Sequence, residues 1–220
     1  MCGILGYWSK NNVSDQTFKK NLKKLNHRGP DNISFKRIGN LLLGHTRLAI
    51  IDLNKTSNQP MQSFCGRYEI VYNGEIYNFL SIKKQLKNFN FFTNSDTEVL
   101  LASYIKWGHE CLSKLNGMFA LAIYDKKKNN IFLARDRIGK KPLFYSCSRH
   151  SFLFSSEIKA LLDFSEIKVD LDVDGINLYF SKGYIGRDKT LFKTIKQLPS
   201  GSFININLNN IKASQPVKFW

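Results

Sequence analysis

The sequence has few cysteines, no long apolar run and no export signal. Its 220 residues include four cysteines, at positions 2, 65, 111 and 147, which form neither a CxxC pair nor a metal-binding spacing. No stretch approaches the roughly 18 apolar residues of a membrane-spanning helix. The first residues lack the basic and apolar regions of a secretory signal. We therefore expect a cytoplasmic protein with reduced thiols, no metal site and no membrane partner.

Acidic residues are also scarce. Asp and Glu number 17 against 33 Lys and Arg, which gives a formal net charge of +16. Such a surplus can indicate a nucleic-acid partner, but the lysines are scattered in groups of two or three. Scattered charge predicts weak association that depends on salt rather than a sequence-specific site. A basic nucleic-acid binder therefore stays an interpretation that rests on charge alone, and we expect no specific nucleic-acid partner.

The signatures of nucleotide and metal cofactors are missing as well. The sequence contains no GxxxxGK[ST] phosphate loop and no GxSxG nucleophile motif. Residues 170–175 match the first half of a calcium loop, but Ser181 stands where a bidentate Glu is required. Asp172 is better explained as the N-cap of a helix. We expect no cofactor in this domain.

The composition is that of a globular domain with both helices and strands. Hydrophobic residues make up 43% and charged residues 23%, and the chain is long enough for a large core without disulfides. Alternation predicts strands at 3–8, 41–53 (one or two strands), 68–72, 118–124, 130–134, 144–145 and 151–154, with a β-like tail over 190–208. Capping residues and helical spacing predict helices after Ser14 and over 77–88, 96–108, 157–162 and 173–180. This pattern predicts an α+β layered domain with mainly antiparallel sheets.

The second residue is the first candidate for chemistry. Cys2 follows the initiator Met1, and its small size makes Met1 a candidate for removal. Removal would leave a thiol and a free α-amine on one residue. The amine titrates near neutral pH, so it could act as the base for its own thiol. The alternative is a small apolar cysteine without a chemical role.

Three further positions offer groups that could bind and polarise an amide. Asn73-Gly74, a turn signal at the predicted end of a strand, offers a side-chain amide and an unhindered main-chain N–H, as an oxyanion hole needs. Arg47 is a charge inside the apolar stretch 41–53, and a buried guanidinium suits a substrate carboxylate. Asp96 could hold an ammonium group, or could only cap its helix. Spacing alone leaves these alternatives open.

Several segments, in order along almost the whole chain, carry a family resemblance. They are MCGILG (1–6), HRGPD (27–31), GHTRLAIID (44–52), QPM (59–61), NGEIYN (73–78), SDTE (95–98), NGMFA (116–120), RDRIGKKPLFY (135–145) and SEIKAL (156–161). Together they resemble the glutamine-hydrolysing domain of asparagine synthetases, a class II amidotransferase of the N-terminal-nucleophile kind. Sugar-phosphate and purine-pathway amidotransferases differ at the RGPD and NGEIYN positions.

The resemblance implies a four-layer αββα sandwich of two mainly antiparallel sheets. It also implies that glutamine is hydrolysed to glutamate and ammonia through a thioester on the N-terminal cysteine. The loop at Arg28 would either cover the site or shape the turn. The resemblance gives catalytic roles to Cys2, Asn73 and Gly74, and roles in binding substrate to Arg47, Leu48, Ile51, Glu75 and Asp96.

The resemblance further implies how the chain is divided. The amidotransferase domain would cover 1–210, and 211–220 would begin a linker to a synthetase domain that is absent from this chain. The SGGxDS loop of that domain is not in the sequence. ATP and magnesium would therefore belong to the absent synthetase domain and not to this one. A synthetase domain or subunit would receive the ammonia, for transfer to aspartate or to a sugar carboxylate. The rival interpretation is a catalytically idle remnant that acts as a binding or regulatory module.

Overall fold

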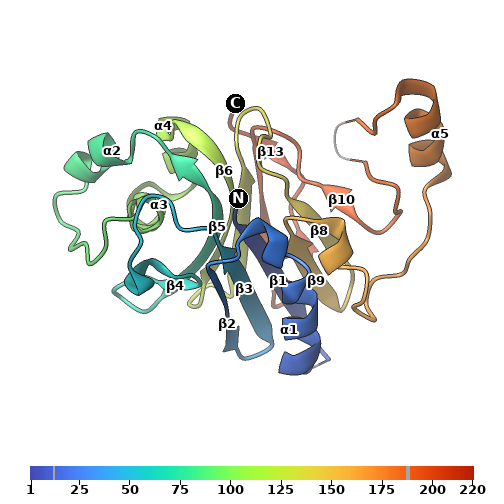
Figure 1. Ribbon diagram of the computed structural model, residues 1–220, viewed down its shortest axis with the longest axis horizontal. Coiled ribbons are helices and arrows are strands. Elements are labelled where there is room, and N and C mark those ends of the chain that lie inside the picture. Colours follow the sequence, from blue (N-terminus) through green and yellow to red (C-terminus); the bar gives the residue numbers. More distant parts are fainter. Residues whose placement is uncertain (12, 187–188) are drawn as a thin grey trace.

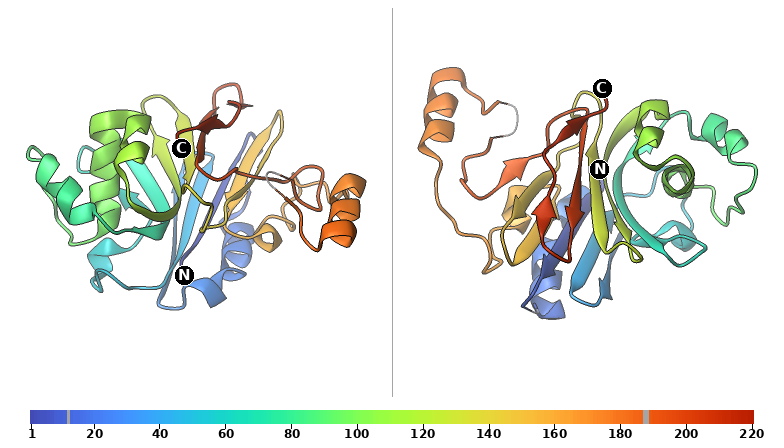
Figure 2. Two further views of the ribbon diagram at one scale, coloured as in Figure 1. Left: turned by 90° about the horizontal axis from the view of Figure 1, so that it is seen from above. Right: turned by 180° about the vertical axis from the view of Figure 1, so that it is seen from behind.

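Two antiparallel sheets pack face to face in the centre of the molecule, and helices cover their outer faces (Figures 1 and 2). The computed structural model describes residues 1–11, 13–186 and 189–220. The first sheet has the order β10 (Lys196–Gln197), β8 (Phe144–Cys147), β9 (Ser151–Ser155), β1 (Gly3–Ser9), β3 (Leu41–Arg47), β2 (Asn32–Ile38). The second has the order β12 (Lys212–Ala213), β11 (Ser202–Asn207), β7 (Asn130–Arg135), β6 (Gly117–Asp125), β5 (Tyr68–Ile76), β4 (Met61–Gln62), and β13 (Val217–Lys218) also pairs with β11.

The helices divide between the two outer faces. Helix α1 (Asp15–Lys23) packs on the first sheet, and α2 (Phe79–Gln85), α3 (Asp96–Trp107) and α4 (Cys111–Lys114) lie on the second (Figure 1). Short 3₁₀ turns complete the connections: η1 (Asn26–Arg28), η2 (Lys55–Ser57), η3 (Gly108–Glu110) and η4 (Ile158–Ala160). Helix α5 (Val173–Lys182) stands apart from both sheets. The predicted αββα sandwich is confirmed, and no helix in the described ranges is long and apolar enough to cross a membrane.

Predicted caps begin three of these helices. The Ser14 side chain accepts a hydrogen bond from the Thr17 amide at the start of α1, and Asp172 caps α5. Ser95 Oγ accepts from the Glu98 amide at the start of α3. The reciprocal half of that capping box is absent from the described contacts, because the Glu98 carboxylate instead accepts from the amides at 92 and 93.

Alternating side chains fill three apolar layers. Along β6, one set of residues packs against α3 and α4, and the other set packs between the two sheets. A third cluster lies between the first sheet and α1. The outward-facing set of β6 is Phe119, Leu121 and Ile123, and the inward-facing set is Ala120, Ala122 and Tyr124. Strands buried on both faces explain the long apolar runs of the sequence.

The same alternation carries polar side chains into one end of the layer between the sheets. Ile4 of β1 faces this layer, and Cys2 lies two residues before it. His45 and Arg47 continue the inward face of β3 after Leu43, and Asn73 continues that of β5 after Val71. Strands β1 and β3 are neighbours, with Gly3 opposite Thr46. The sandwich therefore brings these segments together at one end.

Two predicted strand boundaries are wrong. Asn73-Gly74 is no turn, because β5 continues to Ile76 and pairs with β6 throughout. A Cβ on Gly74 would lie 2.2 Å from the Met118 carbonyl oxygen, so glycine is needed here for the close approach of two strands. The apolar stretch 41–53 forms a strand only to Arg47, and the rest is a loop.

Other boundaries shift without changing the architecture. The helix predicted over 77–88 covers only Phe79–Gln85, and the one predicted over 157–162 is the single turn η4. The tail from 190 forms β10 and β11, with loops between them. Beyond residue 210, β12 and β13 both pair with β11. The domain boundary at 210 stays a prediction.

Candidate active site

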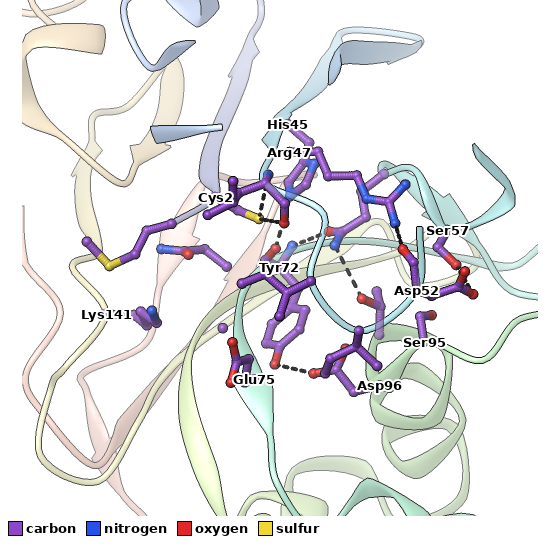
Figure 3. A pocket seen from close by; sticks show the side chains of 18 of the residues that line it. Cys2, His45, Arg47, Asp52, Ser57, Tyr72, Glu75, Ser95, Asp96 and Lys141 are labelled. Atoms are coloured by element: carbon purple, nitrogen blue, oxygen red, sulfur yellow. Dashed lines mark hydrogen bonds between the residues drawn. The ribbon is translucent and has the colours of Figure 1, made fainter. Parts of the chain in front are cut away.

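A pocket with a volume of about 180 Å³ opens where the two sheets meet (Figure 3). The first sheet contributes the N-terminus and the end of β3, and the second contributes the end of β5. The start of α3 and the loop after β7 complete the wall. All the residues for which we predicted roles line this single pocket: Cys2, Arg47, Leu48, Ile51, Asn73, Gly74, Glu75 and Asp96.

Cys2 lies half-buried against the chain just after β3. The Leu48 amide donates to Cys2 Sγ at 3.4 Å, and the thiol lies 3.6 Å from the Leu48 carbonyl oxygen. Burial raises the pKa of the Cys2 thiol, while the contact with Leu48, the N-terminal amine, Arg47 and Lys141 act in the opposite direction. The net result is a neutral thiol, which needs a base before it can attack.

Arg28 fixes the backbone of the same cysteine. Its Nε donates to the Cys2 carbonyl oxygen at 3.0 Å, and its Nη1 donates to Glu157 at 2.8 Å. Although burial opposes ionisation, contacts with Arg28, His27 and Lys159 lower the pKa of Glu157 to about 2. The ion pair with Glu157 thus holds the guanidinium in place. The loop at Arg28 supports the N-terminus from outside the pocket lining.

Arg47 is buried, but its partners are neutral oxygens. Nη1 donates to the Asn54 carbonyl at 2.8 Å and to Asn58 Oδ1 at 2.7 Å, and Nη2 donates to the Asp52 carbonyl. These three bonds use three of the five guanidinium N–H groups. No carboxylate of the described residues lies within 4 Å of it. The charge of Arg47 is therefore left uncompensated beside the pocket.

Asn73 presents an amide that the fold does not use. The residue is 1% exposed, and its Nδ2 has no hydrogen-bond partner among the described residues. A buried, unpaired donor costs free energy, so its presence needs an explanation. Gly74 follows it at the pocket wall. The structure brings these two residues to the pocket on a strand and not at the predicted turn.

Asp96 lines the pocket as the first residue of α3. Its Oδ2 accepts hydrogen bonds from the Tyr72 hydroxyl at 2.8 Å and from the Ile76 amide at 2.9 Å. Burial raises the pKa of the Asp96 carboxyl, which these hydrogen bonds partly oppose. Glu75 is two residues beyond Asn73 on the same face of β5, half-buried. The carboxyl groups of Asp96 and Glu75 therefore line the pocket together with Arg47, and that of Asp52 lines it as well.

Sequence reasoning missed several lining residues. His45 is buried in the wall of the pocket, and burial lowers its pKa to about 3, so it is neutral. Its Nε2 lies 3.2 Å from the Tyr72 carbonyl, which can only accept, so Nε2 carries the proton. Lys141 also lines the pocket, and nothing in the sequence distinguishes it from exposed Lys140. The described residues include no cluster of His, Cys, Asp and Glu suited to a metal ion.

Comparison with known proteins agrees with this arrangement. The model of the glutamine amidotransferase domain family matches residues 1–220. An asparagine synthetase [glutamine-hydrolyzing] 3 of Bacillus subtilis is 43% identical over 90% of this chain and 33% of its own length. A putative asparagine synthetase [glutamine-hydrolyzing] 2 of Methanocaldococcus jannaschii is 39% identical over 90% of this chain and 42% of its own length. The chain thus spans only a third to two fifths of these relatives.

A solved structure shares the fold. The glutamine phosphoribosylpyrophosphate amidotransferase of B. subtilis superposes with a TM-score of 0.69 over 97% of this chain and 49% of that one, at 22% identity. It supports the two-sheet sandwich. With the family model matched along its whole length, the chain belongs to the glutamine amidotransferase domain family.

Proposed function

We propose that this chain hydrolyses glutamine to glutamate and ammonia, with Cys2 as the nucleophile once Met1 is removed. The observation that carries the proposal is the buried, unpaired Nδ2 of Asn73 in the same pocket as the Cys2 thiol. A thiol and a donor without a partner are what acyl transfer at an amide requires. The names of the B. subtilis and M. jannaschii relatives, which describe them as glutamine-hydrolyzing, support the substrate.

The reaction begins with a proton transfer. The α-amine of Cys2 accepts the thiol proton, and the thiolate forms a C–S bond to the side-chain carbonyl carbon of glutamine. The carbonyl oxygen becomes an oxyanion, to which Asn73 Nδ2 and the Gly74 amide donate. The α-ammonium returns the proton to the leaving nitrogen, the C–N bond breaks, and ammonia departs from a thioester.

Water completes the cycle. The α-amine, again neutral, takes a proton from a water molecule that attacks the thioester carbon through a second oxyanion. The C–S bond then breaks, glutamate leaves and the thiol is restored. Arg28 keeps the Cys2 carbonyl fixed during both steps, because it remains tied to Glu157. The neutral His45 takes no part in these transfers, since its pKa is too low.

The charged side chains around the pocket bind the α-carboxylate and the α-ammonium of glutamine and thereby orient it. Arg47, with two free N–H groups and no carboxylate partner among the described residues, receives the α-carboxylate. Asp96 and Glu75 receive the α-ammonium, with Leu48 and Ile51 forming the adjacent wall. The side-chain amide then points to Cys2 and Asn73. No cofactor takes part in this domain.

The ammonia serves a synthetase domain or subunit, to which ATP and magnesium would belong. The relatives that match this chain over about a third of their own length are named asparagine synthetases, which supports this partner. The acceptor would be aspartate or a sugar carboxylate. The protein would act in the cytoplasm.

The proposal is tested with the purified protein, glutamine and no ATP. We expect glutamate and ammonia in equal amounts, and an intact mass that corresponds to loss of Met1. Asparagine, one methylene shorter, is the control substrate, because its amide would not reach Cys2 when its carboxylate is held by Arg47. Protein that lacks Met1 and binds glutamine without releasing glutamate would instead support the idle binding module.

Replacing Arg47 should mainly weaken the binding of glutamine. Arg47 contacts the carboxylate equally before and during the reaction, so Arg47→Ala should raise KM by about 10- to 100-fold with a smaller change in kcat. Arg47→Lys should recover only part, because it lacks the planar fork. Steady-state kinetics measure both constants.

The control for Arg47 separates binding from support of the loop. Asn58→Ala removes one contact of Arg47 but keeps its charge. It should lower the melting temperature without the large rise in KM. Equal effects of Asn58→Ala and Arg47→Ala on KM would show that Arg47 acts only by ordering residues 52–58.

A further inference from the structure

Lys141 is a buried cation in the pocket that contains Cys2. The side chain is 5% exposed and lines the pocket together with Cys2 and Glu75. In the view of Figure 3, Lys141 and Glu75 lie to one side of Cys2, and Arg47 with Asp52 lies to the other. Lys141 comes from the loop between β7 and β8, more than 130 residues after Cys2 in the chain. The two residues are brought together by the fold alone.

The loop at Lys141 is held in place by its own backbone. Asp136 Oδ2 accepts from the Lys141 amide at 2.9 Å and from the Phe119 amide of β6 at 3.2 Å. Asp136 Oδ1 accepts from the Lys140 amide at 2.9 Å. Arg135 Nε donates to the Lys141 carbonyl at 2.8 Å. Both peptide groups of Lys141 are therefore anchored, and its side chain starts from a fixed point.

The ammonium itself has no partner. None of the described residues accepts a hydrogen bond from Lys141 Nζ, and none of their carboxylates lies within 4 Å of it. A buried, unpaired ammonium is costly, and burial lowers the pKa of Lys141. The charged and titratable groups that act on it are Glu75, Arg28, Cys2 and Asp136.

The other cations near the thiol are the N-terminal amine, which is the proposed base, and two arginine side chains that are already engaged. Arg28 is bound to the Cys2 carbonyl and to Glu157, and it lies outside the pocket lining. Arg47 orders the loop through three hydrogen bonds and faces the predicted substrate carboxylate. Two side-chain cations, Arg47 and Lys141, line the pocket in the described ranges, and Lys141 is the one whose head group makes no hydrogen bond. Its charge is free to act on Cys2.

We propose that the Lys141 ammonium is the electrostatic partner of the Cys2 thiolate, and that it stabilises the anion formed when the thiol loses its proton. The inference rests on the proposed function only in taking Cys2 as the nucleophile. No bond forms to Lys141 and it transfers no proton. Its positive charge attracts the thiolate, and the low polarity of the buried site strengthens that attraction. Glu75, which lines the same pocket, acts against the effect of burial on the pKa of Lys141.

The effect on Cys2 can be measured without glutamine. Cys2 is alkylated with iodoacetamide over a range of pH, in a background where the exposed thiols are removed by Cys65→Ser and Cys147→Ser. The variants are Lys141→Met, Lys141→Gln and Lys141→Arg, with Lys140→Met as the matched control on the same loop. Lys140 is exposed and its side chain does not line the pocket. The α-amine of Cys2 is the same in every variant.

We expect the midpoint of Cys2 alkylation to rise by about one pH unit in Lys141→Met and Lys141→Gln, as for loss of a nearby opposite charge. Lys141→Arg should keep most of the original midpoint, and Lys140→Met all of it. The rate at neutral pH should fall by less than the tenfold loss of thiolate, because the less acidic thiolate is the better nucleophile. A merely structural lysine would leave the midpoint unchanged.

Two controls make the result decisive. Cys111 is buried, and burial raises its pKa to about 12, so its alkylation reports unfolding of a variant. If Lys141→Met unfolds, Lys141→Gln and Lys141→Arg give the answer. An unchanged midpoint in folded Lys141→Met or Lys141→Gln overturns the inference. A raised midpoint in a protein that releases no glutamate would overturn the proposed function and leave the role of Lys141 standing.

Discussion

Cys2→Ala is expected to lower the release of glutamate from glutamine by about 10⁴-fold or more, because it removes the atom that forms the thioester. Cys2→Ser should be nearly as inactive, since a hydroxyl is far less acidic than a thiol and a weaker nucleophile. Glutamine should still bind, because the thiol contributes little to ground-state contact. A coupled glutamate assay and isothermal titration calorimetry measure the two quantities.

The folded state should survive this change. Cys2 lies before β1 and makes only two weak contacts through its sulfur, both with the main chain of Leu48. Cys65→Ala, which removes an exposed thiol elsewhere, is the matched control and should keep full activity. Glutamate release by Cys2→Ala at the rate of the unchanged protein would refute the mechanism.

Asn73→Ala is expected to reduce kcat by about 10²–10³-fold with little change in KM. The reason is that Asn73 Nδ2 has no partner among the described residues and would gain one when the oxyanion forms. An interaction made only in the transition state lowers kcat and kcat/KM equally when it is lost. Steady-state kinetics with glutamine test this.

Asn73→Asp sharpens the test. It keeps the shape of the side chain but replaces the donor with an acceptor, so the loss in kcat should be at least as large. Neither variant removes a hydrogen bond made by Nδ2 within the described fold, so the melting temperature of Asn73→Ala should change much less than kcat. If both variants melt several degrees lower and share one defect in KM and kcat, Asn73 supports the fold rather than the oxyanion.

The layers of the fold could be predicted because alternation is a local property. The runs of β6 and β7 carry two apolar faces, and such strands need cover on both sides. Helix starts were predicted well where a single side chain binds the first turn, as at Ser14 and Asp172. These signals lie within a few residues of the feature that they specify.

Features that depend on distant segments could not be predicted in this way. Asn73-Gly74 has the composition of a turn, and only the Met118 carbonyl on the neighbouring strand shows why glycine is required. The apolar run after Arg47 continues as a loop because Asp52 holds it in place. The Asp52 carboxylate accepts a hydrogen bond from Ser57, and the Asp52 carbonyl accepts one from Arg47. Lys141 has the same local sequence surroundings as exposed Lys140, and Asp136 binds the main-chain amides of both. Only the folded loop places Lys141 in the pocket wall and leaves Lys140 exposed.

The position of β1 inside its sheet also sets the order of events during synthesis. Strand β1 pairs with β3 on one side and with β9 on the other. The chain between the end of β3 and the start of β9 is about 100 residues long, and a ribosome needs roughly 5 to 20 s to add them. Through that interval the first sheet is incomplete beside the N-terminus. An aminopeptidase therefore has seconds in which to reach Met1 before β9 closes the sheet next to the nucleophile.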